Sequence, residues 1–312
     1  MDSHCRADCH NVEVLAVEEA EYLANRCSVH TTDTYLAAAI LRLEEHQAKD
    51  SDVEHGGLGF TYKWNMGWMN DTLKYIETDP LFRSSRHGLL TFPMMYAFDE
   101  SFILPLSHDE CVHGKKSFLN KMPGEYNTKF DSLRMYLTYM YTTPGKKLFF
   151  MGTEFGQFIE WRYYEPLEWK LMAYESHRKL HRFTQTLTRF YRRHPALWAD
   201  DRSWSGFEWS NADDAIFDVY SYIRMGQGET LLVVVNTTPT PKYDYYVGTD
   251  VKGRFRLVLN TDAEEFYGSG MQVKPSVSSA PIRQGNHSRL IKLDLPPCSV
   301  LIYRLMGSKK EQ

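Results

Sequence analysis

The pattern of apolar residues changes near residue 205, and this change limits the folds that the chain can adopt. Before it, short apolar runs at 102–107 ("FILPLS") and 146–152 ("KKLFFMG") alternate with segments of helical periodicity at 128–145 and 166–194. Strands that alternate with helices favour a parallel sheet covered by helices. This part of the chain is therefore predicted to be of the α/β class.

Proline marks the expected limits of these elements. Pro166 should open the second long helix, and that helix should end before Pro195, because proline fits the first turn of a helix and interrupts its interior. The run at 90–98 ("LTFPMMYAF") is predicted to be one more short buried strand. It lies so close to the strand at 102–107 that no helix fits between them.

After residue 205 the helical pattern disappears, and turn residues separate runs of strand-forming residues. The predicted strands are "IFDVYSYIRM", "TLLVVVN", "YDYYVGT", "RFRLVLN", "SRLIKLDL" and "SVLIYRL". Alternation of Phe255, Leu257 and Leu259 indicates a sheet with one buried face. The C-terminal part is therefore predicted to be a separate all-β domain, an antiparallel β-sandwich.

The first 55 residues have a different character. Two helices are predicted, "VEVLAVEEAEYLANRC" and "TYLAAAILRLEEHQA". Cys5, Cys9 and Cys27 also lie here, and "HCRADCH" could ligate a metal or simply hold reduced thiols. Its spacing matches no strong zinc pattern, so reduced thiols are favoured and no metal or other cofactor is expected.

Charge and hydropathy exclude two classes of partner. A net charge of -4 argues against nucleic acid. No apolar run approaches the roughly 20 residues that span a bilayer, and "MDSHCRADCH" lacks the apolar core of a signal peptide. The cytoplasm is the expected location.

Aromatic residues are frequent, at 14% of the chain. Most are expected to pack in the core, as aromatic side chains usually do. Aromatic faces also suit sugar rings, because an apolar face and a polar edge match the C–H groups and hydroxyls of a sugar.

Ionisable residues follow both predicted strands of the α/β part. His108, Asp109 and Glu110 come after the strand at 102–107, and Glu154 follows the strand at 146–152. The carboxyl ends of parallel strands share one edge, where active sites of α/β barrels lie. By pattern alone a His-Asp pair after a strand is more often a cap or a turn than a catalytic group.

Several long motifs resemble one known family. They are "GGLGFTYKWNMGWMNDTLKYIETDP", "LPLSHDECVHGKKSFLNKMPGEY", "PGKKLFFMGTEFGQFIEW" and "LNTDAEEFYGSG". Together they resemble the bacterial 1,4-alpha-glucan (glycogen) branching enzymes of the alpha-amylase superfamily. The resemblance implies the C-terminal portion of a (β/α)8 barrel in residues 56–204, a β-sandwich in 205–312 and an atypical helical segment in 1–55.

The resemblance also implies roles for individual residues. Such enzymes cut an alpha-1,4 linkage and transfer the freed segment to a 6-hydroxyl by a retaining mechanism. Asp109 is the implied transition-state stabiliser, and His108 the implied ligand of a sugar hydroxyl. Glu154 is expected either to line the glucan cleft or to cap the next segment. Trp64 lies in a motif that resembles a family segment near the sugar site, although tryptophan at such spacing more often belongs to the core.

Two catalytic groups of the family are not recognisable in the chain. The family's nucleophilic Asp and proton-donating Glu lie upstream of "GGLGF", and within residues 1–55 only "LAVEEA" is faintly similar to the donor motif, with Glu18 as its candidate. The solvated face of a helix is the simpler interpretation of Glu18. The expected function is that of a branching enzyme in truncated form. The alternative is an inactive alpha-glucan-binding remnant, and a cysteine-based metal protein is a more remote one.

The 312-residue chain is predicted not to branch amylose by itself. Retaining transfer needs a nucleophile and an acid/base about 5 Å apart, and without the attacking carboxylate no glycosyl-enzyme intermediate forms. Purified chain incubated with amylose should yield no more alpha-1,6 branch points, scored after debranching digestion, than a mock purification. Branching above that background would show that residues 1–55 or a partner chain supply the missing groups.

Overall fold

The computed structural model describes residues 60–112 and 114–307. The chain divides into two compact units, residues 1–63 and 64–312. The predicted N-terminal helices, Glu18 and the three N-terminal cysteines lie outside the described residues. The α/β part and the all-β part both fall within the larger unit, and the domain limits predicted from the sequence stay predictions.

A small sheet of three strands carries the residues of interest. It contains β1 (Lys63–Trp64), β2 (Phe102–Leu106) and β3 (Lys146–Phe149) in the order β1-β2-β3. β2 and β3 are parallel, with Leu106 opposite Phe149. Both strands predicted here are confirmed, although β3 is half-buried where a buried strand was expected.

The predicted strand at 90–98 is wrong. This segment forms a short helix, α4 (Gly88–Thr91), followed by a 3-10 turn, η3 (Phe92–Met95). Pro93 has no N–H for a sheet ladder and fits the first turn of a helical segment. Met95 is 74% exposed, so the apolar run is not a continuous buried stripe.

Three longer helices cover the small sheet: α3 (Met66–Glu77), α6 (Tyr126–Thr142) and α7 (Glu175–Arg193). The helix predicted at 128–145 is confirmed as α6, which is buried around most of its circumference because it lies between two layers. The end of α7 at Arg193 confirms the stop predicted before Pro195.

The predicted start of the second helix at Pro166 is wrong. A 3-10 turn, η6 (Trp169–Ala173), comes first, and α7 begins only after it. The Glu168 N–H donates to Oε1 of Gln157 at 2.9 Å, and its carboxylate accepts hydrogen bonds from two loop N–H groups. These contacts bind the segment to the loop after β3 in place of a helical turn.

The C-terminal part is an antiparallel β-sandwich, as predicted. Its strands are β4 (Phe207–Asp214), β5 (Val219–Gly226), β6 (Glu229–Asn236), β7 (Lys242–Thr249), β8 (Arg254–Asn260), β9 (Ser276–Ser278), β10 (Arg289–Leu295) and β11 (Ser299–Leu305). A six-stranded sheet of order β4-β5-β6-β11-β8-β9 faces a two-stranded sheet of β10 and β7. The sequence interpretation missed β4 and β9.

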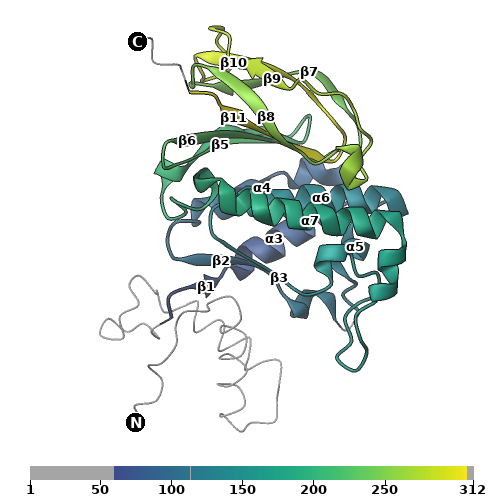
Figure 1. Ribbon diagram of the computed structural model, residues 1–312. Coiled ribbons are helices and arrows are strands. Elements are labelled where there is room, and N and C mark those ends of the chain that lie inside the picture. The colour runs from purple at the N-terminus through teal and green to yellow at the C-terminus, as the bar shows by residue number, and fades with distance from the viewer. Residues whose placement is uncertain (1–59, 113, 308–312) are drawn as a thin grey trace, which may run out of the picture. The chain divides into compact units, whose positions relative to one another are not determined.

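The large sheet is buried on both faces, so the prediction of one buried face is wrong. Tyr222 and Val233 belong to the core shared with the helices, whereas Ile223 and Val234 belong to the core between the two sheets. Figure 1 shows the helices between the small parallel sheet and the sandwich. The register of β8 against β11 shifts between Ile302 and Tyr303, which places the residues of β8 on different faces.

Buried arginines join the helical layer to the large sheet. Arg83, in the 3-10 segment η2 (Pro80–Arg86), donates to the carbonyl of Thr237 after β6. Arg134 of α6 donates from Nε to the carbonyl of Thr261 at 3.0 Å. Both arginines are at most 1% exposed. Burial lowers the pKa of Arg134, and the neighbouring carboxylates oppose this change.

A third buried arginine extends from the large sheet to the helical layer. Arg224 of β5 donates to the carbonyl of Thr142 at the end of α6, at 2.5 Å, and pairs with Asp201 at 2.9 Å. Lys146 also reaches Asp201, at 3.2 Å. The side chains of Arg224 and Asp201 are 0% and 5% exposed, so the pair is desolvated and depends on these hydrogen bonds.

The substitution Arg224→Met should therefore destabilise the larger unit strongly. It leaves the buried carboxylate of Asp201 with Lys146 as its remaining charged partner, and breaking a buried pair from one side costs about 3–5 kcal/mol. Urea unfolding measures the change. Arg182→Ala is the control, because the Arg182–Glu265 pair is more than half exposed and should contribute at most about 1 kcal/mol. Equal losses in the two variants would contradict the role given to the buried pair.

Candidate functional site

The end of β2 carries the paired side chains His108 and Asp109. The chain leaves β2 through extended Ser107 and turns in a 3-10 segment, η4 (His108–Cys111). Nε2 of His108 lies 3.1 Å from Oδ1 of Asp109, and their side chains are 28% and 35% exposed. The structure thus brings the two predicted residues together on an accessible rim.

Aromatic rings stand behind this pair. The ring centroid of His108 lies 5.8 Å from that of Phe150 and 6.3 Å from that of Trp161. Main-chain hydrogen bonds fix both neighbours, since the Phe150 N–H donates to the Leu106 carbonyl and the Trp161 N–H to the Cys111 carbonyl, each at 2.8 Å. We call His108, Asp109, Phe150 and Trp161 the rim. The sequence predicts glucan binding through aromatic and rim residues in the range 58–161, which includes Trp161, but it assigns Trp161 no individual role.

Glu154 lies beyond the end of β3, in the 3-10 turn η5 (Thr153–Phe155). Gly152 and Gly156 on either side have φ angles of 91° and 71°, in the left-handed region that favours glycine. Oε2 of Glu154 is buried and has no hydrogen-bond partner among the described residues. Within that part of the chain neither η5 nor α7 has a side-chain cap, so the structure shows no capping role for Glu154.

Helix α7 holds the turn that carries Glu154. Oγ1 of Thr184 donates to the Glu154 carbonyl at 2.9 Å, and Nδ1 of His177 donates to the Phe155 carbonyl at 2.8 Å. Burial lowers the pKa of His177, so the imidazole stays neutral with its proton on Nδ1. Hydrogen bonds from uncharged side chains of α7 to main-chain carbonyls therefore fix the position of the turn that carries Glu154.

Trp64 lies on β1 beside β2 and is half-buried. The next residue, Asn65, receives a hydrogen bond on Oδ1 from the Trp68 N–H at 2.8 Å and so caps α3. Trp68 is 1% exposed and stacks on Tyr136 with 6.3 Å between the centroids, so it belongs to the core. Within the described residues, no hydrogen bond, ion pair or ring contact joins Trp64 or Glu154 to the rim.

Cys111 ends η4 and could be mistaken for a nucleophile. Burial raises its pKa to about 12, with smaller opposing and reinforcing effects from Lys121 and Asp109. The thiol is therefore protonated at neutral pH and unreactive.

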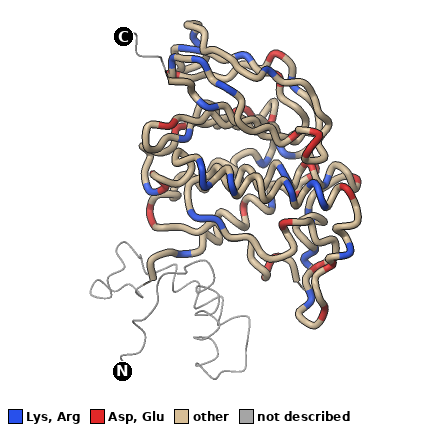
Figure 2. The backbone as a smooth tube through the Cα atoms, in the orientation of Figure 1, with Lys and Arg blue, Asp and Glu red and all other residues tan. Residues whose placement is uncertain are grey.

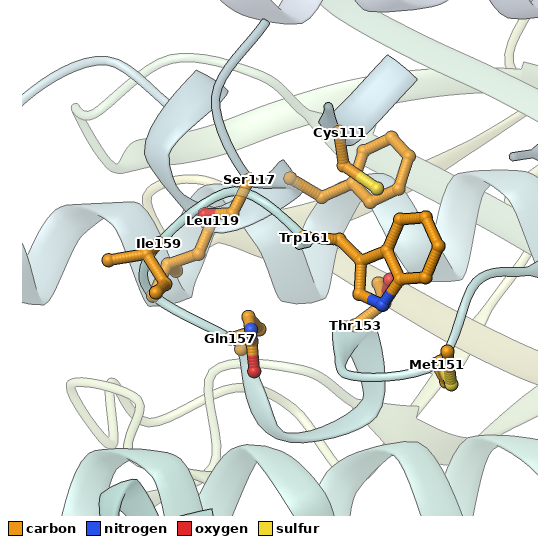
Figure 3. Close-up of a pocket in the computed structure, with 10 residues that line it drawn as sticks. Cys111, Ser117, Leu119, Met151, Thr153, Gln157, Ile159 and Trp161 are labelled. Carbon is orange, nitrogen blue, oxygen red and sulfur yellow. The ribbon is translucent and has the colours of Figure 1, made fainter. Parts of the chain in front are cut away.

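A small cavity lies beneath the rim, lined by Cys111, Ser117, Leu119, Thr153, Gln157 and Trp161 among others. Figure 3 shows these side chains, with the indole of Trp161 near Cys111 and Thr153. Its volume of about 10 Å³ holds at most one water molecule. A sugar ring does not fit inside this cavity.

One group of side chains in the sandwich has the composition of a metal site. Ligand atoms of Glu208, Asp250 and His287 lie within 4.8 Å of one another. Both nitrogens of His287 are already hydrogen-bonded, Nδ1 to Asp250 and Nε2 to the Ser210 carbonyl, each at 2.9 Å. Asp250 also accepts from the N–H and hydroxyl of Ser288. These hydrogen bonds account for the proximity of the three side chains, because they join the loop that contains Asp250 to the loop that contains His287 and Ser288.

Basic residues of α7 are partly neutralised by acidic neighbours. Figure 2 shows Lys and Arg along the helical layer, with Asp and Glu distributed over the loops. Lys179 pairs with Glu175 at 2.8 Å and Arg182 with Glu265 at 3.0 Å. Such pairing reduces the positive charge with which α7 could bind the phosphate backbone of a nucleic acid.

Comparison with known proteins identifies the class. Residues 209–306 match the family described as the alpha amylase, C-terminal all-beta domain. The structure resembles the alpha-amylase from H. orenii with a TM-score of 0.51 and 14% identity, over 80% of this chain and 49% of that one, which shows the fold alone. The chain therefore has the architecture of the alpha-amylase class, and the predicted fold is confirmed.

Sequence relatives define the family more narrowly. The 1,4-alpha-glucan branching enzyme GlgB 1 of Clostridium perfringens (strain SM101) is 48% identical over 266 residues, which are 84% of this chain and 40% of that protein. GlgB of Francisella tularensis subsp. novicida is 46% identical over 81% of the chain and 40% of its own length. Over the matched residues the chain is similar to proteins named 1,4-alpha-glucan branching enzyme. It spans about 40% of the length of these curated relatives.

None of the helices in the described part of the chain is long and apolar enough to cross a membrane.

The hydrogen bonds of Asp250 make the stability of the sandwich depend on pH. Bonds from Ser288, and then from His287, lower its pKa from 3.8 to about 2. A carboxyl group whose pKa is lower in the folded state stabilises that state above its ordinary pKa, and this contribution disappears as the pH falls through the lowered value. The melting temperature of the wild type should exceed that of Asp250→Asn above pH 4, and the difference should shrink between pH 4 and 2. A difference that stayed constant over this range would contradict the assignment.

Proposed function

We propose that this chain carries the transition-state-stabilising part of a 1,4-alpha-glucan branching-enzyme active site, and that it binds alpha-1,4-glucan at the rim. The observation that carries the proposal is the His108–Asp109 pair, held on an accessible strand end against two aromatic rings. Relatives that bear the name of this activity support it.

Asp109 is suited to the stabilising role by charge and by position. Glycosyl transfer passes through an oxocarbenium-like state whose sugar ring gains positive charge. A carboxylate fixed beside the ring interacts more strongly as that charge develops, which lowers the barrier without strengthening ground-state binding. The short turn η4 fixes Asp109 directly at the end of β2, so little reorganisation is needed.

His108 is suited to orient the sugar. If Nε2–H donates to Asp109, Nδ1 remains free to accept a hydrogen bond from a hydroxyl, and Trp161 and Phe150 restrict the ring from behind. Trp64 and Glu154, half-buried on β1 and η5, would contact a glucan that extends from the rim along the strand ends.

Catalysis requires groups that the described residues do not provide. The nucleophile and the proton donor have no recognisable motif in this sequence, and Glu18, the weak donor candidate, lies outside the described residues. We propose that the chain becomes active only with an upstream barrel that supplies both carboxylates. The alternative, an inactive glucan-binding remnant, is favoured by the same missing motifs. A cytoplasmic location and the absence of nucleic-acid, membrane and cofactor partners stay predictions.

Affinity electrophoresis tests the binding that both alternatives share. Migration of the purified chain should slow in gels that contain amylose or glycogen. Unchanged migration at any polysaccharide content would refute glucan binding by this chain.

The role of Asp109 is tested by Asp109→Asn. The substitution keeps the shape of the side chain and removes its charge, so glucan binding should persist. In a fusion to the upstream barrel of a relative, turnover should fall by at least about 100-fold, since the lost interaction acts mainly in the transition state. Glu110→Gln is the matched control, because Glu110 lies in the same turn and pairs with Lys115 at 3.3 Å. Equal turnover in the two variants would refute the role, as would unfolding of Asp109→Asn.

A further inference from the structure

The loop after η5 exposes two adjacent tyrosines at the tip of a turn. The Glu165 N–H donates to the Arg162 carbonyl at 3.1 Å, which places Tyr163 and Tyr164 at the two central positions of a β-turn. They are 82% and 66% exposed. Turn chemistry favours glycine, proline, asparagine or aspartate at such positions, so the conformation of the turn does not explain the two aromatic rings.

The turn is braced on both sides. Before it, the Trp161 N–H donates to the Cys111 carbonyl at 2.8 Å. Across it, Nη1 of Arg162 pairs with Oε1 of Glu165 at 3.2 Å. After it, the carboxylate of Glu168 accepts hydrogen bonds from the main chain of the preceding loop. A loop held in this way presents its side chains with little loss of conformational entropy on binding.

This loop also joins the tyrosines to the rim. Trp161 belongs to the rim, and two residues of chain bring the backbone from Trp161 to Tyr163, a span of at most about 7 Å between their Cα atoms. A ligand seated against His108 and Trp161 therefore needs to extend only a short way to meet the turn.

The geometry of the two rings suits a curved chain of sugars. The ring centroids of Tyr163 and Tyr164 lie 5.2 Å apart, and the ring planes are perpendicular. Coplanar rings would form a flat platform for a straight polysaccharide. Perpendicular rings present faces in two directions, and successive glucose rings of an alpha-1,4-glucan also change direction along the chain. The phenol hydroxyls supply polar edges for sugar hydroxyls.

We propose that Tyr163 and Tyr164 form an outer subsite that holds an alpha-1,4-glucan one or two glucose residues beyond the rim. The inference rests on the proposed function, because the rim fixes where the glucan begins. The outer subsite contributes to the affinity for long chains and takes no part in the chemistry.

The test compares three variants of the full chain by titration with maltoheptaose and with maltose. Tyr163→Ala/Tyr164→Ala should bind maltoheptaose roughly three- to tenfold more weakly, whereas maltose, whose two rings are held at the rim, should bind as it does to the wild type. Tyr163→Phe/Tyr164→Phe keeps the aromatic faces and should stay within about twofold of the wild type. Tyr243→Ala is the matched control, since Tyr243 is 71% exposed on β7 of the sandwich.

The outcomes separate this inference from the proposed function. A wild-type chain that binds neither sugar overturns the proposed function. A wild type that binds maltoheptaose, with unchanged affinity in the double alanine variant, overturns only the outer subsite. A double variant that changes the oligomeric state in sedimentation and leaves glucan affinity unchanged also overturns it, in favour of protein contact. If the double variant melts at a lower temperature, Tyr163→Ala and Tyr164→Ala, tested singly, give the same comparison.

Discussion

The contacts of buried arginine side chains with main-chain carbonyls hold the larger unit together. Arg83, Arg134 and Arg224 each reach from one layer to a carbonyl in another. A guanidinium removed from water is costly unless its donors are satisfied, and carbonyl groups at element ends need donors as well. The hydrogen bonds of Arg83 and Arg224 meet both requirements, whereas Nη1 of Arg134 has no hydrogen-bond partner among the described residues. Because the large sheet is buried on both faces, the sandwich and the helices depend on this interface for a shared core.

The position of the site follows from that interface. Arg224 and Lys146 bind Asp201 on either side, and Arg224 also fixes the carbonyl that ends α6. The chain then enters β3 through Gly145, whose φ of 112° favours glycine and where a Cβ would lie 3.2 Å from Cγ of Leu104. β3 pairs with β2, and the rim forms where both strands end. The sandwich, which contributes no residue to the rim, thus supports the strands that carry it.

Local pattern was sufficient where a segment's own residues determine its structure. The apolar runs of β2, β6 and β11 and the periodicity of α6 predicted those elements correctly. Pattern failed where tertiary contacts decide, as in the turn before α7, where Glu168 bonds to the loop after β3. β4 was missed because its sequence "FEWSNADD" is mostly polar and its pairing with β5 is irregular.

In the candidate site, too, the residues at the strand ends could be predicted from the sequence, whereas contacts between distant parts of the chain could not. His108 and Asp109 were predicted because a strand end and a motif lie together in the sequence. The contact of Trp161 with His108 was not predicted, because the place of Trp161 depends on a hydrogen bond to Cys111, 50 residues earlier in the chain. Glu154 was predicted from its strand end, yet its buried Oε2 could not have been foreseen from the motif.

Binding and chemistry are physically separable in this arrangement. The rim is built by β2, β3 and the loop that carries Trp161, and each of these lies inside the compact unit and is fixed by contacts within it. A nucleophile and an acid would have to approach from outside the rim, because the cavity beneath it admits no sugar. Under the proposed function, the rim side chains would therefore keep their geometry whether or not an attacking carboxylate is present. Transition-state stabilisation by Asp109 would have no effect until a glycosidic bond is broken beside it, so the binding of a glucan at the rim would not require the chemistry.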